Sequence, residues 1–130
     1  MIAIRNIFCG CIMLLWISKS FAQDVSISSP DEKLTVKLSL DQGRLYYRVL
    51  LQGNEMLEKS PLGLRGTKVD LSTSLRLTGK SSRYVDETYT EEKIKTSTVQ
   101  YQANELVCKF ENLSRNQMEV VFRVSNNNIA

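Results

Sequence analysis

Four carboxylates in the second half of the chain are the residues closest to forming an acid-base site. They are Asp86, Glu87, Glu91 and Glu92. Paired carboxylates can act as general acid and base when both face one substrate from about 5 to 10 Å apart. Adjacent residues of a β-strand point to opposite faces, so Asp86 and Glu87 do not form such a pair. The four acids also lack the spacing of an EF-hand calcium loop. We interpret them as a solvated charge pattern and assign no catalytic, cofactor-binding or metal-binding residue.

Nucleophilic chemistry has little support from the sequence. Histidine is absent, which removes the base of a Ser-His or Cys-His pair and the commonest zinc ligand. Cys9 and Cys11 lie in an apolar amino-terminal run, so Cys108 stands alone in the rest of the chain and no disulfide is expected there. Cys108 alternates with Leu106 and Phe110 as in a strand, which predicts a buried structural thiol.

Tyrosines are the candidates for a binding function. After residue 22 the chain contains Tyr46, Tyr47, Tyr84, Tyr89 and Tyr101. An exposed ring flanked by amides or charges can form a platform for the apolar C–H face of a sugar. Cross-strand and core packing explain most of these rings more simply. Both interpretations stay open at this point.

The segment Asn112-Leu113-Ser114 matches the acceptor motif for N-glycosylation. A motif this short occurs often by chance, and its use depends on the host. We therefore predict no modification from it.

The first 22 residues have the pattern of a signal peptide. Arg5 supplies a positive charge, residues 7–17 form an apolar run, and Ser20-Phe21-Ala22 ends in a small residue. The run is shorter than the roughly 20 apolar residues that span a bilayer, which disfavours a retained membrane anchor. Gln23 follows the cleavage point, where a lipoprotein would have cysteine. We predict cleavage after Ala22 and a periplasmic or secreted product.

Charge gives no indication of a polyanionic partner. Lys and Arg outnumber Asp and Glu by 17 to 14 in the whole chain, but Arg5 and Lys19 lie in the predicted signal peptide. Residues 23–130 therefore carry 15 basic and 14 acidic side chains, a net charge of +1. The basic residues do not cluster, so we expect neither nucleic-acid binding nor membrane binding after cleavage.

Residues 33–51 contain the clearest structural pattern, a β-hairpin. Apolar and polar residues alternate over 33–40 and again over 45–51, which gives each strand one apolar face. Residues 41–44 contain Gly43 and supply the turn, and residues 52–55 supply the next one.

Pro61 and Gly63 constrain the segment that follows this hairpin. Pro61 has no backbone donor, which predicts a strand start or an edge strand. Gly63 is compatible with a bulge, a close backbone contact or simple packing. These three roles of Gly63 are not separated by the sequence.

The other predicted elements are also short strands. They are a leading strand over residues 24–29, one or two strands between 65 and 82 with a break at 79–82, a strand over 83–90, a loop or helical turn at 91–95, and a final hairpin over 106–124. No run has convincing helical periodicity, so we predict an all-β, antiparallel β-sandwich. Residues 126–130 form a turn leading toward something apolar, and we expect an incomplete domain that is the first part of a longer product.

Several segments together resemble the amino-terminal domain of glycoside hydrolase family 97, the exported glucosidases and galactosidases of gut Bacteroidetes. In order, they are the signal peptide, Ser29-Pro30-Asp31-Glu32-Lys33-Leu34, Ser60-Pro61-Leu62-Gly63-Leu64, Asp86-Glu87-Thr88-Tyr89, Asn104-Glu105-Leu106 and Phe122-Arg123-Val124-Ser125-Asn126. Their order and spacing are more specific than any one of them. The resemblance covers nearly all of residues 23–130 but less than half of the family's amino-terminal domain.

The resemblance implies a large β-sandwich, or supersandwich, packed on a (β/α)8 catalytic barrel, with calcium near the active site of the full-length enzyme. The catalytic carboxylates and the metal ligands belong to segments beyond the matched region, so it places no cofactor in this chain. Residues 91–96 replace the family's usual Trp-Gly-containing loop. Asn128 stands where the family has glycine, which predicts a strained or degenerate turn because asparagine tolerates positive φ less freely than glycine.

The leading hypothesis is therefore a non-catalytic portion of an exported glycoside hydrolase that supports a barrel absent from this chain. One alternative is a stand-alone carbohydrate-binding β-sandwich module without catalysis, with an oligosaccharide as its partner. Another is an assembly or adhesion module that uses exposed strand edges.

Overall fold

The computed structural model describes residues 23–91 and 97–130. All regular elements in these ranges are strands: β1 (Gln23–Ser28), β2 (Leu34–Asp41), β3 (Arg44–Leu51), β4 (Asn54–Leu62), β5 (Leu64–Arg65), β6 (Asp70–Leu71), β7 (Arg76–Glu91), β8 (Ser97–Glu111) and β9 (Gln117–Ser125). Their sheets are antiparallel, which confirms the all-β prediction. The same ranges contain no helix that is long and apolar enough to span a membrane. The predicted signal peptide (1–22) and most of the predicted loop or helical turn (92–95) lie outside the described residues.

Strands β1 to β4 form a four-stranded sheet in chain order. The predicted hairpin has the register that its alternation requires, because β2 and β3 pair from Leu34–Leu51 to Asp41–Arg44. Both residues of its turn, Gln42-Gly43, have positive φ (49° and 75°), as do those of Gln52-Gly53 (51° and 82°). Two residues of positive φ form the type I′ turn, whose twist matches that of the flanking strands.

Pro61 and Gly63 lie where this sheet ends. Pro61 is in β4, an edge strand, as predicted. A Cβ on Gly63 would be only 2.8 Å from the Ser72 Cα, so the close backbone contact is the reason for glycine here. The two short strands β5 and β6 then pair with each other and lead into the second sheet.

Strands β7, β8 and β9 form the second sheet. The final hairpin is confirmed, since β8 and β9 pair from Glu111–Gln117 to Ala103–Ser125. The predicted break at residues 79–82 is wrong, because these residues lie inside the 16-residue strand β7. The register shifts between Leu77 and Gly79, and regular pairing with β8 then resumes. The extra residue of this bulge is Thr78, and backbone pairing with the long strand β8 outweighs the weak strand preference of residues 79–82.

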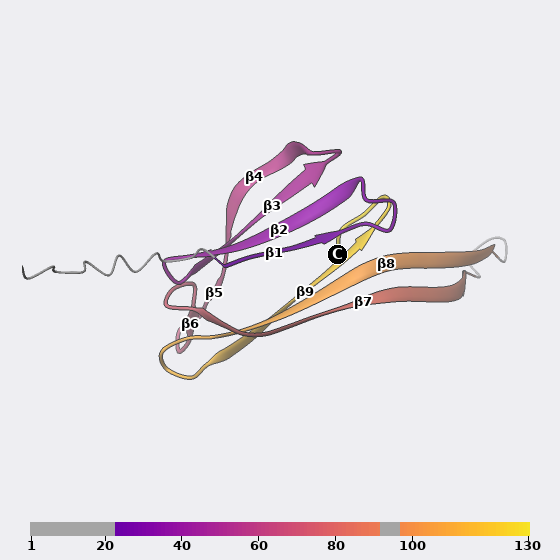
Figure 1. Ribbon diagram of the computed structural model, residues 1–130. Helices are drawn as coiled ribbons and strands as arrows, with labels where there is room; N and C mark the ends of the chain where they lie inside the picture. The colour runs from indigo at the N-terminus through magenta and orange to yellow at the C-terminus, as the bar shows by residue number, and fades with distance from the viewer. Residues whose placement is uncertain (1–22, 92–96) are drawn as a thin grey trace, which may run out of the picture.

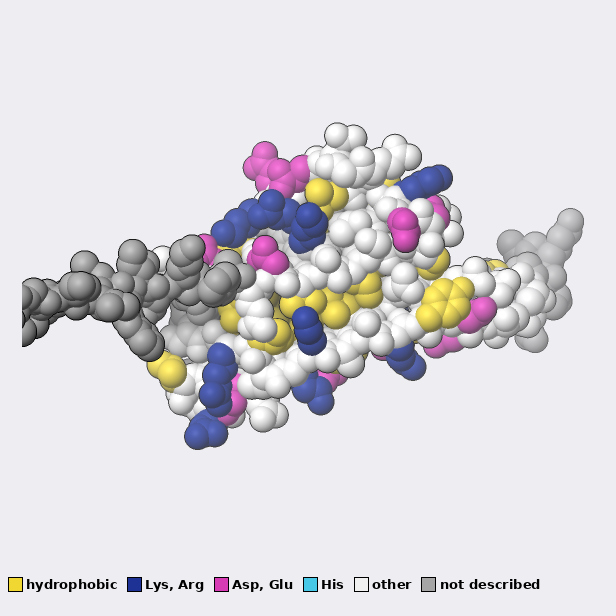
Figure 2. Space-filling view, in the orientation of Figure 1, with side chains coloured by type: hydrophobic (Ala, Val, Ile, Leu, Met, Phe, Trp, Pro, Cys, Tyr) yellow, Lys and Arg dark blue, Asp and Glu magenta, His cyan; other side chains and the backbone are white. Residues whose placement is uncertain are grey.

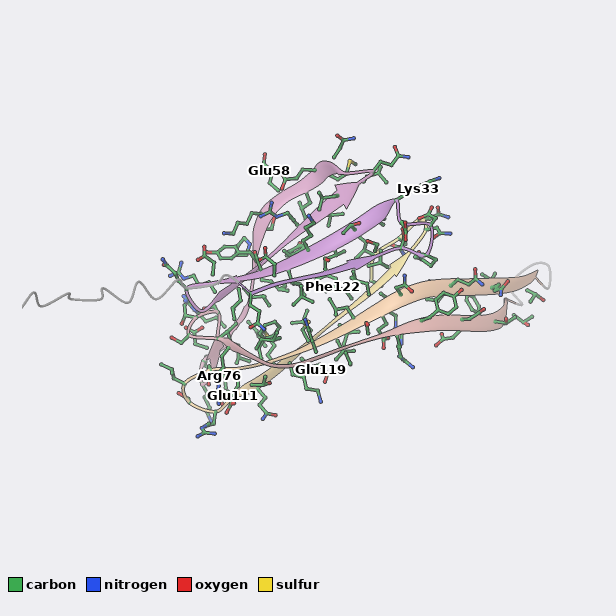
Figure 3. The ribbon with its side chains drawn as sticks, in the orientation of Figure 1. Lys33, Glu58, Arg76, Glu111, Glu119 and Phe122 are labelled. Atoms are coloured by element: carbon green, nitrogen blue, oxygen red, sulfur yellow. The ribbon has the colours of Figure 1, made fainter. Side chains whose placement is uncertain are left out.

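The two sheets face each other as two layers around one hydrophobic core (Figure 1). Within this core cluster, the side chains that are at most 3% exposed come from both layers: Val36, Leu38, Leu45, Leu106, Cys108, Phe110 and Val124. The rings of Tyr47 and Phe122 also meet across the layers, with centroids 6.1 Å apart. Figure 3 shows Phe122 pointing into the space between the sheets.

Strands β7 and β8 continue past the end of the first sheet as a two-stranded arm (Figure 1). The arm comprises residues 84–91 of β7 and 97–104 of β8, which pair from Tyr84–Asn104 to Glu91–Ser97. Strand β9 accompanies it only at its root, where Ala103 and Asn104 pair with Ser125 and Val124. The first sheet does not cover it, so both of its faces meet solvent over most of its length.

Residues 126–130 turn back onto β9. Arg123 and Ala130 exchange two backbone hydrogen bonds of 2.7 and 2.8 Å, and the Ser125 amide donates to the Asn128 carbonyl at 2.8 Å. Asn128 does not have positive φ, so the predicted strain at this residue is wrong. The backbone of the turn closes on β9 without needing a left-handed conformation there.

Candidate functional site

Asp86 and Glu87 lie on opposite faces of the arm, as the sequence predicted. The Gln100 Nε2 donates to the two Asp86 carboxylate oxygens at 3.1 and 3.3 Å, and the Gln102 Nε2 donates to Asp86 Oδ2 at 3.2 Å. Glu87 pairs with Tyr101 across the strands on the other face. The two carboxylates therefore do not face one substrate. Asp86 instead belongs to a polar row with Gln100 and Gln102.

Tyr84 lies next to this polar row, at the root of the arm, and is 54% exposed. It borders an open groove of about 400 Å³ between β1 and β7, whose other lining residues are Ser26, Ile27, Ser28, Ser82, Arg83 and Asn104. Figure 2 shows hydrophobic side chains in the band between the two layers, with charged side chains on either side of it. An exposed ring beside a carboxylate and carboxamides has the chemistry of a sugar platform.

The other four tyrosines are placed differently. Lys59 Nζ lies 4.3 Å from the centroid of the Tyr46 ring, so an ammonium group occupies that face. Tyr47 packs on Phe122. Tyr89 and Tyr101 lie on the face of the arm opposite Tyr84, away from the groove. Of the five predicted tyrosines, Tyr84 therefore lines the groove between β1 and β7, and Tyr46 lines a separate one of about 330 Å³ beside Pro61 and Gly63.

An ion cluster that the sequence analysis missed crosses the outer face of the second sheet. Glu105 of β8 accepts hydrogen bonds from Arg83 Nε of β7 at 2.6 Å and from Arg123 Nε of β9 at 2.5 Å. The Glu105 side chain is 6% exposed. Hydrogen bonds from Arg83 and then Arg123 lower the pKa of Glu105 from 4.5 to about 2. The carboxylate is therefore charged at neutral pH, and the cluster ties three strands together.

The three charged residues of this cluster can be recognised as neighbours only when the strand register is known. Arg83 pairs with Glu105, and Glu105 pairs with Arg123, in one row across the sheet. A similar pair lies at the far end of the same face, where Arg76 Nη2 donates to Glu111 Oε2 at 2.8 Å (Figure 3).

Cys108 serves the fold. It is fully buried in the core, and burial raises the pKa of its thiol. A thiol that resists ionisation is a poor nucleophile, so the prediction of a structural cysteine is confirmed.

Asn112, the acceptor residue of the glycosylation motif, is 8% exposed. Its Nδ2 donates to the Asp70 carbonyl at 2.9 Å, and its Oδ1 accepts from the Asn116 amide at 2.9 Å. The nitrogen that would carry a glycan is therefore held inside the protein, where it closes the β8–β9 turn against β6.

Calcium, which the family resemblance implies for the full-length enzyme, does not fit the acids of residues 23–91 and 97–130. No three acidic or thiol side chains gather there as a metal site. Asp86 is held by two glutamines, and Glu105 lies between two arginines that would repel a cation.

Comparison with known families identifies the fold. The family model described as Glycosyl-hydrolase 97 N-terminal matches residues 27–130, which is nearly all of the described part. The chain belongs to this family. The two-layer structure described above is therefore that of a chain from the family 97 amino-terminal domain.

Individual relatives agree with this assignment. A probable retaining alpha-galactosidase of Streptomyces bingchenggensis is 33% identical over 103 residues, which cover 79% of this chain and 16% of that protein. The crystal structure of a beta-arabinopyranosidase is 42% identical with a TM-score of 0.76, covering 82% of this chain and 17% of that one. A family 97 enzyme from Pseudoalteromonas sp. strain K8, in complex with panose, has the same fold at 18% identity and a TM-score of 0.74, covering 81% and 16%.

This family 97 chain thus spans about one sixth of the length of each of these relatives. The activities named for them belong to much longer proteins.

Proposed function

We propose that this chain is the non-catalytic amino-terminal β-sandwich portion of an exported glycoside hydrolase, which supports a (β/α)8 barrel that cleaves α-glycosidic bonds. The observation that carries the proposal is the family match over residues 27–130 in a chain that spans only 16–17% of its enzyme relatives. A domain of this kind contributes a rigid layered surface rather than reacting groups.

The environments of the described acidic residues support a non-catalytic role for this domain. Glu105 is held as a charged anion by Arg83 and Arg123, so it is not a proton donor near neutral pH. Asp86 and Glu87 face away from each other. Neither arrangement provides the facing pair of carboxyl groups that glycoside hydrolysis uses.

Three further parts of the proposal extend beyond the described residues. The partner is a catalytic barrel, normally on the same chain as this domain. Calcium belongs to the full-length enzyme, with ligands outside this chain. Export to the periplasm or the medium depends on residues 1–22, whose pattern is that of a signal peptide.

The test of catalytic silence is a hydrolysis assay. The purified chain is incubated with nitrophenyl α-glucoside and nitrophenyl α-galactoside, and release of nitrophenol is followed by absorbance. We expect no turnover above the blank. Turnover that survives rigorous purification would overturn the proposal.

A stand-alone carbohydrate-binding module is the second candidate, and the observation that favours it is the exposed Tyr84 ring beside the groove. The two candidates differ in what the gene encodes. A reading frame that continues past Ala130 into alternating strands and helices, with acids at the strand ends, supports the barrel-supporting domain. A stop codon at that point supports the module.

A further inference from the structure

Tyr84, Asp86, Gln100 and Gln102 lie on one face of the arm, the face that continues the core side of the second sheet. Tyr84 pairs with Asn104, and Asp86 with Gln102, so their side chains share this face. The face projects past the first sheet, where Tyr84 borders the groove of about 400 Å³. Asp86 and Gln102 follow Tyr84 and Asn104 along the same face of the two strands, so the polar row continues outward from the groove.

We propose that this face binds a neutral oligosaccharide, with Tyr84 as the stacking ring and Asp86, Gln100 and Gln102 as the groups that recognise hydroxyls. The inference rests on the proposed function, because it gives a sugar-cleaving enzyme an accessory surface for its substrate class on the amino-terminal domain.

The carboxylate of Asp86 is already oriented for this role. Gln100 and Gln102 both donate to it, at 3.1 to 3.3 Å, which holds the three side chains in a fixed arrangement. A carboxylate oxygen has lone pairs for further donors, and each carboxamide keeps an acceptor oxygen and a second N–H. Vicinal sugar hydroxyls, which both donate and accept, match this set.

The charge of the face selects a neutral sugar over an acidic one. Asp86 places a negative charge in the middle of the polar row. The Arg83 guanidinium points to the opposite, outer face of the sheet, where its Nε is bound to Glu105 at 2.6 Å. A uronic acid on the Tyr84 face would therefore meet the negative charge of Asp86.

The groove itself is structurally supported. The Asn104 Nδ2 donates to the Ser28 carbonyl at 2.8 Å, which links β8 to β1 beside Tyr84. The Ser28 hydroxyl lies 2.9 Å from the Thr35 hydroxyl, and this contact joins β1 to β2. The root of the arm is thus fixed to the first sheet, and a ring placed there needs little ordering on binding.

The arm provides its own matched control. Tyr89 lies on the same strand and is 47% exposed, close to the 54% of Tyr84, but it points to the opposite face. If only the Tyr84 variant loses binding, the sugar binds to the face that carries Tyr84. Loss in both variants would mean that any exposed ring on the arm is sufficient.

The experiment is calorimetric titration of the purified chain with maltotetraose, and with a galacturonic acid tetramer as the acidic comparison. We expect an isotherm for maltotetraose that Tyr84→Ala weakens about tenfold and Tyr84→Phe largely retains. Asp86→Ala is expected to weaken it about tenfold as well, and Tyr89→Ala to leave it unchanged. Circular dichroism confirms that each variant is folded.

Three results would overturn the inference. The first is the absence of an isotherm with up to about 10 mM maltotetraose, which would mean an affinity too weak for recognition. The others are equal weakening of binding by Tyr84→Ala and Tyr89→Ala, and tighter binding of the acidic tetramer than of maltotetraose. None of these results bears on catalytic silence, which the nitrophenyl assay tests separately.

Discussion

The β7–β8 hairpin contains two regions made from the same two strands in different surroundings. In its buried half, Leu106, Cys108 and Phe110 face the first sheet and are at most 3% exposed. In the arm, the same strand face carries Asp86, Gln100 and other polar side chains that meet solvent. The backbone pairing runs unbroken from Gly79–Lys109 to Glu91–Ser97.

The difference shows what each half contributes. Burial of apolar surface stabilises the two-layer body at roughly 25 cal/mol per Å². A two-stranded ribbon has marginal stability of its own in water, so the arm keeps its shape because its root is part of the body. Most side chains on the arm therefore lie outside the core, whereas Val85 and Ala103 near its root are buried.

The largest expected effect is a cavity in the body. Leu38→Ala removes a core side chain that is 2% exposed, and we expect a loss of about 2 to 5 kcal/mol in the free energy of unfolding. Tyr89→Ala on the arm, where the side chain is 47% exposed, is expected to change it by less than about 0.5 kcal/mol. Urea unfolding followed by circular dichroism measures both. Equal losses would show that body and arm are equally well packed.

The two turn glycines sharpen the comparison within the first sheet. A Cβ on Gly43 would lie 2.9 Å from the Ser74 Cα, whereas a Cβ on Gly53 would meet nothing within 4 Å. Both have positive φ, so each alanine variant pays about 1 kcal/mol for a left-handed conformation. Gly43→Ala must also displace the backbone at Ser74, and we expect it to cost about 1 to 3 kcal/mol more than Gly53→Ala. Equal unfolding midpoints would contradict this close contact.

Low pH should weaken the ion pairs that Glu105 forms with Arg83 and Arg123 across the three strands of the second sheet. Glu105 has its pKa lowered to about 2 in the folded chain, so its contribution to stability is complete above about pH 5 and is lost as the pH falls through about 2. We expect the stability difference between the wild type and Glu105→Gln to shrink over this window. Urea unfolding between pH 7 and pH 2 measures it.

The control for this acid effect is Glu119→Gln, on the same face of the sheet. Its partner Lys109 is 3.8 Å away, a looser and more exposed pair than those of Glu105. Its stability difference from the wild type should vary less with pH. A Glu105→Gln difference that stays constant from pH 7 to pH 2 would contradict the assigned pKa.

The smallest expected effect is that of Asp86→Ala on stability. Asp86 is exposed and its partners are glutamines that water can satisfy, so we expect a change of less than about 0.5 kcal/mol. The unfolding midpoint in urea measures it. A loss of 2 kcal/mol or more would mean that the polar row holds the arm together rather than offering groups to a ligand.

Local pattern was enough to predict much of the fold. Alternation over residues 33–51 specified two strands, and the glycines at 43 and 53 supplied the positive φ that the turns between β2, β3 and β4 use. The buried state of Cys108 followed from the same period-two pattern. The prediction of a break at residues 79–82 was wrong because these turn-forming residues pair with residues of β8 that lie 24 to 30 positions away in the sequence.

The sequence by itself determined the strands, their apolar faces and their tight turns, because these depend on residues next to each other in the chain. Tertiary structure alone decided that Arg83, Glu105 and Arg123 form one row, and that Tyr84 borders the groove between β1 and β7 while a lysine covers one face of Tyr46. The charged row depends on the strand register of the second sheet. The groove beside Tyr84 depends on where the first sheet ends relative to the longer second sheet. Both are set by packing between segments far apart in the sequence.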